Sequence, residues 1–190
     1  MLNIIDKYLK DLENCFFINI DGFNKSELDI FFKDKPDLIK GIHEKELYRN
    51  NWNILIKCLN DNLSFRFRNM EIFGQRHSYN GLLSFNSDNN SIIFSISFPF
   101  KLIAFRYSKF MMNLNTKKNE ELLSYSEIDN ETSIAKEILI NLINLYFPNF
   151  NIFNNNYADY IIESIIIDGV KHEKINLWNA LFSTNNHGTI

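Results

Sequence analysis

The sequence predicts an α+β fold in which a single antiparallel β-sheet of about four to six strands is packed on one face by helices. One observation is a run of strand-like segments separated by turn-rich breaks between Leu63 and Phe110. Another is that segments on both sides of this run, in particular 2–12 and 132–146, carry apolar residues at helical spacing. A chain with helices flanking consecutive strands is typical of this fold class.

Alternation of apolar and polar residues defines the strands. Phe65 and Phe67 fall on one face of a strand, while Arg66 and Arg68 fall on the other. In the segment 91–98, aliphatic and aromatic residues alternate with serines in the same way. We therefore expect one core face, and one solvated face that carries arginine and serine.

The helices are predicted from spacing and from their boundaries. Residues 2–12 form an amphipathic helix, and 132–146 forms a second one that ends before Pro148. A long helix is expected within 37–62, beginning near His43 and burying Leu47, Ile54, Leu55 and Leu59 with Trp52 nearby. Pro36 is expected to end a short helix that starts at Ser26.

Several shorter segments are ambiguous. Pro99 marks either a turn between two strands, which we favour, or a bend in one edge strand. The segment 157–168 satisfies both a helical and a strand pattern, and this choice stays open. Short strands are expected at 15–20 and 122–128, and a short closing helix is expected around Trp178.

The chain of 190 residues is expected to be a single globular domain, 1–190. We divide it into an N-terminal helical part (1–62), a β-sheet core (63–128) and a C-terminal helix-containing part (129–190). Cys15 and Cys58 stand among apolar residues and are expected in the core, without a disulfide. No apolar run approaches the ~20 residues of a membrane span, so we expect a soluble, cytoplasmic protein.

Charge is distributed unevenly along the sequence. Residues 1–62 have a net charge of −2 and residues 63–118 a net charge of +6, whereas residues 119–190 have a net charge of −7. Four of the five arginines lie in the basic middle segment. The two charged segments therefore predict two different kinds of binding surface.

The basic segment predicts a site for an anion or an acidic partner at Arg66, Arg68, Arg106 and His77. His77 is expected in a loop at the sheet rim, where a general base could stand. The simpler interpretation is that the arginines only solvate the outer face. Nucleic acid is an unlikely ligand, because the pI is about 5.8 and no RNA- or DNA-binding motif is present.

The acidic segment predicts a surface for a basic protein partner at Asp159, Glu163, Asp168 and Glu173. Acidic binding surfaces steer a basic partner and accelerate association. The simpler interpretation here is an ordinary solvated acidic face.

No catalytic signature accompanies these charges. Each of the two His-Glu pairs lacks the second histidine that a zinc-binding helix requires four residues later, and the six glycines are scattered rather than grouped in a phosphate loop. We expect no metal and no cofactor. The sequence favours a small cytosolic inhibitor, an immunity protein that neutralises a cognate bacterial toxin by direct contact, rather than an enzyme. The alternative is an enzyme or small-ligand binder that holds an anionic substrate on the basic sheet face; the oligomeric state stays open.

Overall fold

The computed structural model describes residues 3–18, 35–61, 65–70, 77–85, 90–113, 118–167 and 170–182. The helices are α1 (Ile4–Cys15), α3 (Pro36–Leu47), α4 (Arg49–Asn60), α5 (Asn130–Tyr146) and α6 (Leu177–Phe182), with a 3-10 turn η2 (Asn155–Tyr157). The strands are β1 (Phe17–Ile18), β2 (Phe65–Asn69), β3 (Ser78–Phe85), β4 (Asn90–Ser97), β5 (Leu102–Asn113), β6 (Lys118–Ser124), β7 (Asn151–Ile152), β8 (Ile161–Ile167) and β9 (Val170–Asn176).

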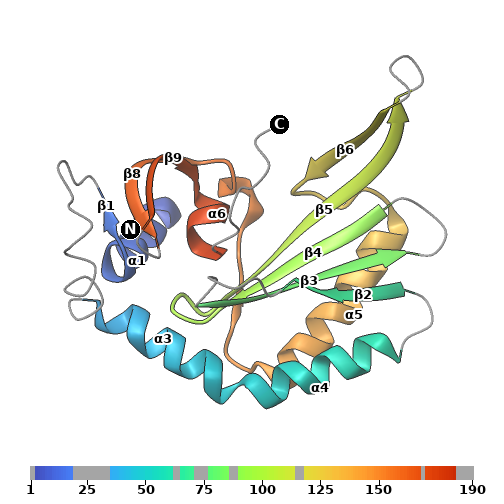
Figure 1. Ribbon diagram of the computed structural model, residues 1–190, viewed down its shortest axis with the longest axis horizontal. Helices are drawn as coiled ribbons and strands as arrows, with labels where there is room; N and C mark the ends of the chain where they lie inside the picture. Colours follow the sequence, from blue (N-terminus) through green and yellow to red (C-terminus); the bar gives the residue numbers. More distant parts are fainter. Residues whose placement is uncertain are drawn as a thin grey trace.

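The predicted α+β class is confirmed, but the sheet prediction was too simple. The large sheet has the order β2-β3-β4-β5-β6, all antiparallel, and the short β7 adds a parallel pair with β5. A second sheet has the order β1-β8-β9 and joins segments from near the two ends of the chain (Figure 1). The expectation of a single, purely antiparallel sheet is therefore wrong.

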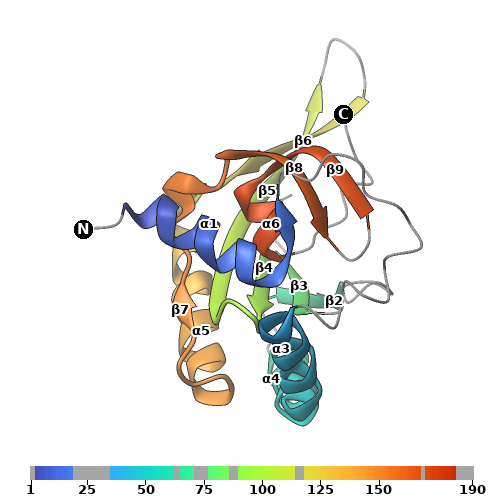
Figure 2. The ribbon, with the colours of Figure 1, turned by 90° about the vertical axis from the view of Figure 1, so that its left-hand side faces the viewer.

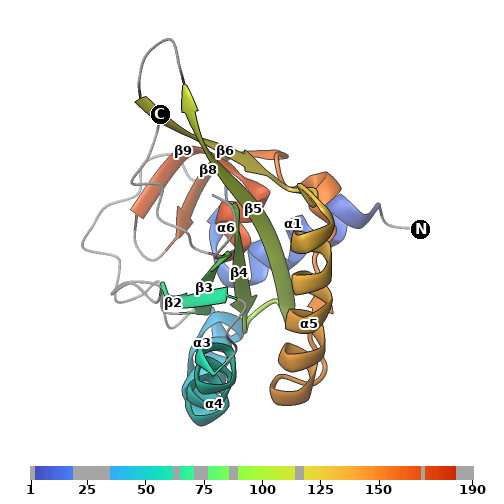
Figure 3. The same cartoon turned by 90° about the vertical axis from the view of Figure 1, so that its right-hand side faces the viewer.

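Both faces of the large sheet are covered, which corrects the expectation of one solvated face. Helices α4 and α5 lie on the face that carries Phe94 and Phe105, whereas α1, α6 and the small sheet lie on the face that carries Ile93 and Ala104 (Figures 2 and 3). The serines of β4 are at most 3% exposed. Ser91 and Ser95 can be buried because their hydroxyls have hydrogen-bond partners, whereas the buried hydroxyl of Ser97 has none among the described residues.

Side-chain hydrogen bonds within the protein satisfy polar groups on this serine face. Ser78 Oγ donates to the Phe182 carbonyl at the end of α6, at 2.9 Å. Ser95 Oγ donates to Asn80 Oδ1, and the hydroxyls of Ser91 and Ser108 lie 2.6 Å apart on neighbouring strands. Helix α6 can therefore dock on a face that the alternation pattern alone assigns to solvent.

The two helices predicted with the clearest spacing are confirmed, and their first turns explain where they begin. Asn3 and Asp6 form a capping box at the start of α1. At the start of α5, Asp129 accepts a hydrogen bond from the Thr132 backbone amide, and the Thr132 hydroxyl accepts one from the Asp129 amide. The apolar residues whose spacing predicted this helix do not form its buried face, since Ile134 is 51% exposed, Ile138 is 37% exposed and Leu145 is 69% exposed. Leu139 and Ile143 are fully buried instead.

The predicted long helix within 37–62 is two helices. Pro36 is the first residue of α3, where a proline loses no intrahelical hydrogen bond. The chain turns at Tyr48, where α4 starts. Of the residues expected to be buried, Leu55 and Leu59 are, but Leu47 is 70% exposed and Ile54 is 39% exposed. The helix predicted from Ser26 lies outside the described residues.

The favoured alternative at Pro99 is confirmed, since 98–101 forms the turn between β4 and β5. Lys101 closes this turn with φ 52°, a left-handed conformation. Helix α3 packs directly on the turn, and Gly41 is the residue that meets Pro99. The turn is thus clamped between the helix and the sheet.

The open choice at 157–168 is resolved as a strand, β8, preceded by the turn η2. Ser164 has φ 52° and no partner in the β8–β9 register. This irregularity interrupts the strict alternation, so Ile162 and Ile165, three apart, are both buried. A kinked strand therefore reproduced the three-residue spacing that is typical of a helix.

Candidate functional site

A groove of about 360 Å³ lies between α1 and the first half of β8, and we call it the α1–β8 groove. Tyr160 is 40% exposed and Ile161 is 51% exposed, which is high for such large apolar side chains. The groove is lined by Leu9, Glu13, Ile18, Tyr160, Ile161, Ile162 and Glu163. A mixture of exposed apolar and charged side chains is common at protein-binding surfaces.

Two carboxylates stand at this groove, one from each wall. Leu9 and Glu13 are four residues apart on α1 and so project from the same side of the helix. Glu163 comes from β8, and its carboxylate lies 3.8 Å from Lys174 Nζ on β9. Because both side chains of that pair are more than 70% exposed, the ion pair contributes only ~0–1 kcal/mol and leaves Glu163 available to a partner.

The other predicted acidic residues do not line the groove. Asp159 is exposed in the turn before β8, and its charge contributes to raising the pKa of the Tyr125 hydroxyl, although burial is the main cause. Glu173 is exposed on β9 and pairs with Lys171 at 3.3 Å. Asp168 lies outside the described residues. Of the three described residues, Glu163 is the one that lines the α1–β8 groove.

The predicted basic residues are not brought together. Arg66 and Arg68 are exposed on β2, as the alternation predicted. Arg106 shares a cross-strand row with Arg68, Leu82 and Ile93, which places it three strands away, at a distance of ~14 Å. It is partly buried, with its guanidinium 4.8 Å above the Trp178 ring of α6. An anion site shared by all four predicted residues is therefore not present.

His77 was predicted in a loop at the sheet rim where a general base could stand, but its burial opposes that role. His77 is fully buried, immediately before β3, with its ring 5.5 Å from the Phe16 ring and 6.3 Å from the Phe100 ring. Burial, together with the nearby charge of Lys45, lowers the pKa of this imidazole to about 3, despite an opposing hydrogen bond with the Leu181 backbone. His77 is therefore a neutral core residue at ordinary pH.

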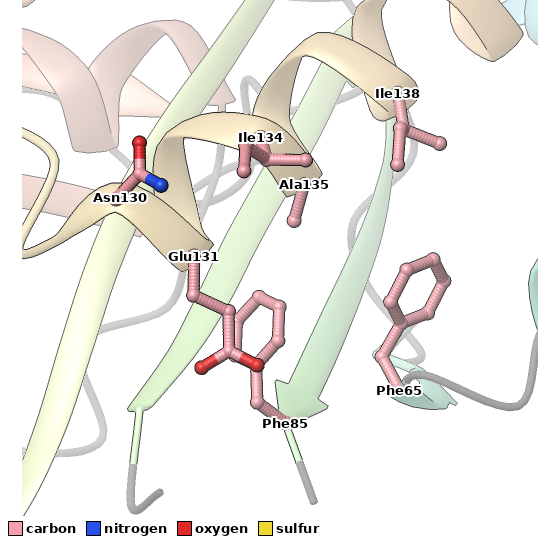
Figure 4. A pocket seen from close by; sticks show the side chains of 7 residues that line it. All are labelled: Phe65, Phe85, Asn130, Glu131, Ile134, Ala135 and Ile138. Atoms are coloured by element: carbon pink, nitrogen blue, oxygen red, sulfur yellow. The ribbon is translucent and has the colours of Figure 1, made fainter. Parts of the chain in front are cut away.

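A second groove, of about 380 Å³, lies between α5 and the edge of the large sheet, and we call it the α5 groove. Figure 4 shows Ile134, Ala135 and Ile138 of α5 above Phe65 of β2 and Phe85 of β3. The two phenylalanines are cross-strand partners with ring centroids 6.4 Å apart. Asn130 and Glu131 complete the lining at the start of α5.

The described residues offer little for redox or metal chemistry. Cys15 is buried, and burial raises the pKa of its thiol to about 12, so it is held as an unreactive thiol; Cys58 is only half-buried and lies 3.4 Å from the Tyr146 hydroxyl. Within the described ranges, no three histidine, cysteine or acidic side chains are grouped so as to hold a metal ion. Of the helices that the structure describes, none combines the length and apolarity needed to span a bilayer.

The fold and these surfaces define an α+β protein with two surface grooves. Comparison with protein-family models, with curated proteins and with solved structures gave no match. The sequence did not indicate the α1–β8 groove, because Glu13 and Tyr160 are 147 residues apart and meet only through the fold. The one signal available was the i, i+4 pair Leu9 and Glu13, which is ordinary for an amphipathic helix.

Proposed function

We propose that this chain is a binding protein that neutralises a cognate toxin by direct contact, an immunity protein in function, and that the α1–β8 groove receives a basic segment of that toxin. The observation that carries the proposal is the groove itself, with exposed Tyr160 and Ile161 between the carboxylates of Glu13 and Glu163. Partly exposed tyrosine is a frequent anchor in protein interfaces, and rim carboxylates select a basic partner.

The enzymatic alternative has less support. Arg66 and Arg68 lie on the edge strand β2, Arg106 packs on Trp178 of α6, and His77 is in the core. The four predicted residues therefore do not surround one substrate. Arg66 and Arg68 remain candidates for an acidic ligand, and His77, the general base that the sequence offered, is buried in the core. A binding role for this pair of arginines is the more economical interpretation.

The experiment uses the products of the genes that flank the coding sequence of this chain. Each product is expressed with and without the chain, growth is followed, and the affinity of the purified pair is measured. We expect one product to be toxic alone, and to bind the chain and be neutralised by it. If no flanking product binds or is neutralised, the proposed function is wrong.

The contribution of the groove is tested by variants in that complex. Tyr160→Ala should weaken binding by at least ~30-fold, as expected for loss of an interface anchor of about 2 kcal/mol. Glu13→Lys with Glu163→Lys should slow association and reduce its salt dependence. Glu137→Lys, at an exposed site of α5, is the control with the same change of charge for each of the single variants Glu13→Lys and Glu163→Lys. Binding that survives all groove variants would place the interface elsewhere.

A further inference from the structure

Strand β2 is the terminal strand of the large sheet, and it pairs with β3 from Phe65 to Asn69 without interruption. On its other edge, no strand of the described part of the chain pairs with it. A terminal strand presents unpaired backbone N–H and C=O groups, which can take up a further strand. The backbone register shows which groups these are.

The backbone N–H of Met70 donates to the Asn80 carbonyl across the β2–β3 ladder, at 2.9 Å. In an antiparallel ladder, alternate residues turn their N–H and C=O groups toward the same neighbour. The even-numbered positions Arg66 and Arg68 therefore bond to β3, and the backbone groups of Phe65 and Phe67 point to the outer edge. This edge has the donors and acceptors that an added strand requires.

The side chains of β2 divide sharply between the two faces. Phe65 and Phe67 lie on the helix-covered face, and the α5 groove continues from Phe65 on that face (Figure 4). Arg66 and Arg68 lie on the opposite face, exposed, and neither forms an ion pair within the described part of the chain. Residues of an added strand stand opposite those of β2 and share their faces.

We propose that the outer edge of β2 binds an extended segment of a partner protein by strand addition, and that this segment alternates apolar and acidic residues. Its apolar residues stand opposite Phe65 and Phe67, where one side chain enters the α5 groove, and its acidic residues stand opposite Arg66 and Arg68. The α5 groove, at about 380 Å³, is large enough for an aromatic side chain. The proposal is independent of the α1–β8 groove.

Charge on an edge strand also has a protective role, because it opposes pairing between copies of a sheet edge. Two arginines on one face are consistent with that role for a second copy of this chain, which would bring arginine against arginine. An acidic segment would instead be attracted to this edge, since its carboxylates complement the same arginines. The charge that excludes a second copy thus selects the proposed occupant.

The test uses the full chain and a synthetic peptide, acetylated and amidated, of sequence Ser-Glu-Val-Glu-Phe-Glu-Val-Ser. We expect saturable binding, and at least ~10-fold weaker binding when lysine replaces glutamate or when the same residues are shuffled to remove the alternation. In the double variant Arg66→Glu, Arg68→Glu the preference should reverse toward the lysine peptide. The double variant Lys171→Glu, Lys174→Glu, an equal change of charge on the edge strand β9, should leave both affinities unchanged.

Strand addition itself is tested through the backbone. N-methylation of one alternating set of peptide amides should abolish binding, whereas N-methylation of the other set should not, because only one set faces β2. Amide exchange at Phe67 should slow at least ~10-fold when the peptide is bound. The proposal is overturned if no saturable binding occurs up to ~1 mM peptide, if the lysine or shuffled peptide binds as well, or if both N-methylated sets behave alike.

Discussion

Gly41 is the position where the structure opposes a general rule most directly. In a helix interior, Gly→Ala normally stabilises by ~1 kcal/mol. A Cβ on Gly41 would lie only 2.7 Å from Pro99 Cδ and from Pro99 N, and would also overlap Cγ of that ring. The proline ring belongs to the tight turn between β4 and β5 and cannot swing aside as a flexible side chain does. Overpacking of this kind costs ~1–3 kcal/mol.

Because the Cβ would meet three atoms of a residue that cannot move aside, we take the upper part of this range, ~2–3 kcal/mol. Subtracting the gain of ~1 kcal/mol in helix propensity, we expect Gly41→Ala to lower the free energy of unfolding by about 1–2 kcal/mol. For a chain of this length that lowers the melting temperature by ~2–8 °C. Urea unfolding followed by tryptophan fluorescence is a suitable assay, because Trp52 and Trp178 are both buried.

Two controls separate the contributions. The stability difference between Lys40→Ala and Lys40→Gly, at the adjacent exposed position, measures helix propensity in the same helix. Gly41→Ala in a Pro99→Ala background should cost less than in the natural chain, because the opposing ring is gone. If Gly41→Ala is instead stabilising by the amount measured at Lys40, the close packing of α3 on this turn is refuted.

Two further predictions concern pH and helix capping. The pKa of His77 is lowered from 6.5 to about 3 in the folded chain, so between these pH values the unfolded chain binds a proton that the folded chain does not. The free energy of unfolding is therefore highest above pH 6.5 and decreases as the pH falls, by about 2 kcal/mol at pH 5. His77→Gln should flatten this pH dependence in urea titrations at several pH values, and an unchanged slope would show that His77 is not the group responsible. Asp129→Ala removes the cap of α5, where the carboxylate accepts from the Thr132 amide at 2.8 Å, and should cost ~1–2 kcal/mol. Asn141→Ala, halfway along the same helix, is the control in thermal unfolding, and equal melting temperatures for the two variants would contradict the capping role.

The elements that the sequence predicted well are those whose stabilisation is local. Helix α5 has its helical spacing and its terminating proline within one short segment, and its bounds were predicted almost to the residue, although the face that it buries was not. The apolar face of β4 followed from alternation alone, and its Phe94 and Ile96 are fully buried. In both cases the deciding interactions lie within a few residues of each other along the chain.

The errors arise where partners are distant in sequence. Phe17 pairs with Ile166, so the small sheet is visible only after the chain has folded. The hydroxyl of Ser78 is buried because it reaches the Phe182 carbonyl, 104 residues away. His77 is neutral because Phe16 and Phe100 enclose it. A polar residue in a strand predicts solvent only when no distant group can satisfy its hydrogen bonds.

The same limit applies to charge. The charge count along the chain joined Glu163 and Glu173 in one acidic surface. In the folded chain, however, Lys174 of β9 lies beside Glu163 of β8, and Lys171 lies beside Glu173 on β9 itself. What distinguishes Glu163 is the groove that it lines beside the exposed Tyr160 and Ile161, to which α1 contributes Leu9 and Glu13 from the other end of the sequence. Likewise Arg66 and Arg68 differ from Arg106 because they flank an open strand edge, whereas Arg106 packs on Trp178. A charged residue becomes a candidate for binding when it lies beside exposed apolar surface or beside a strand edge with unpaired backbone groups. The net charge of a sequence segment predicts neither of these features.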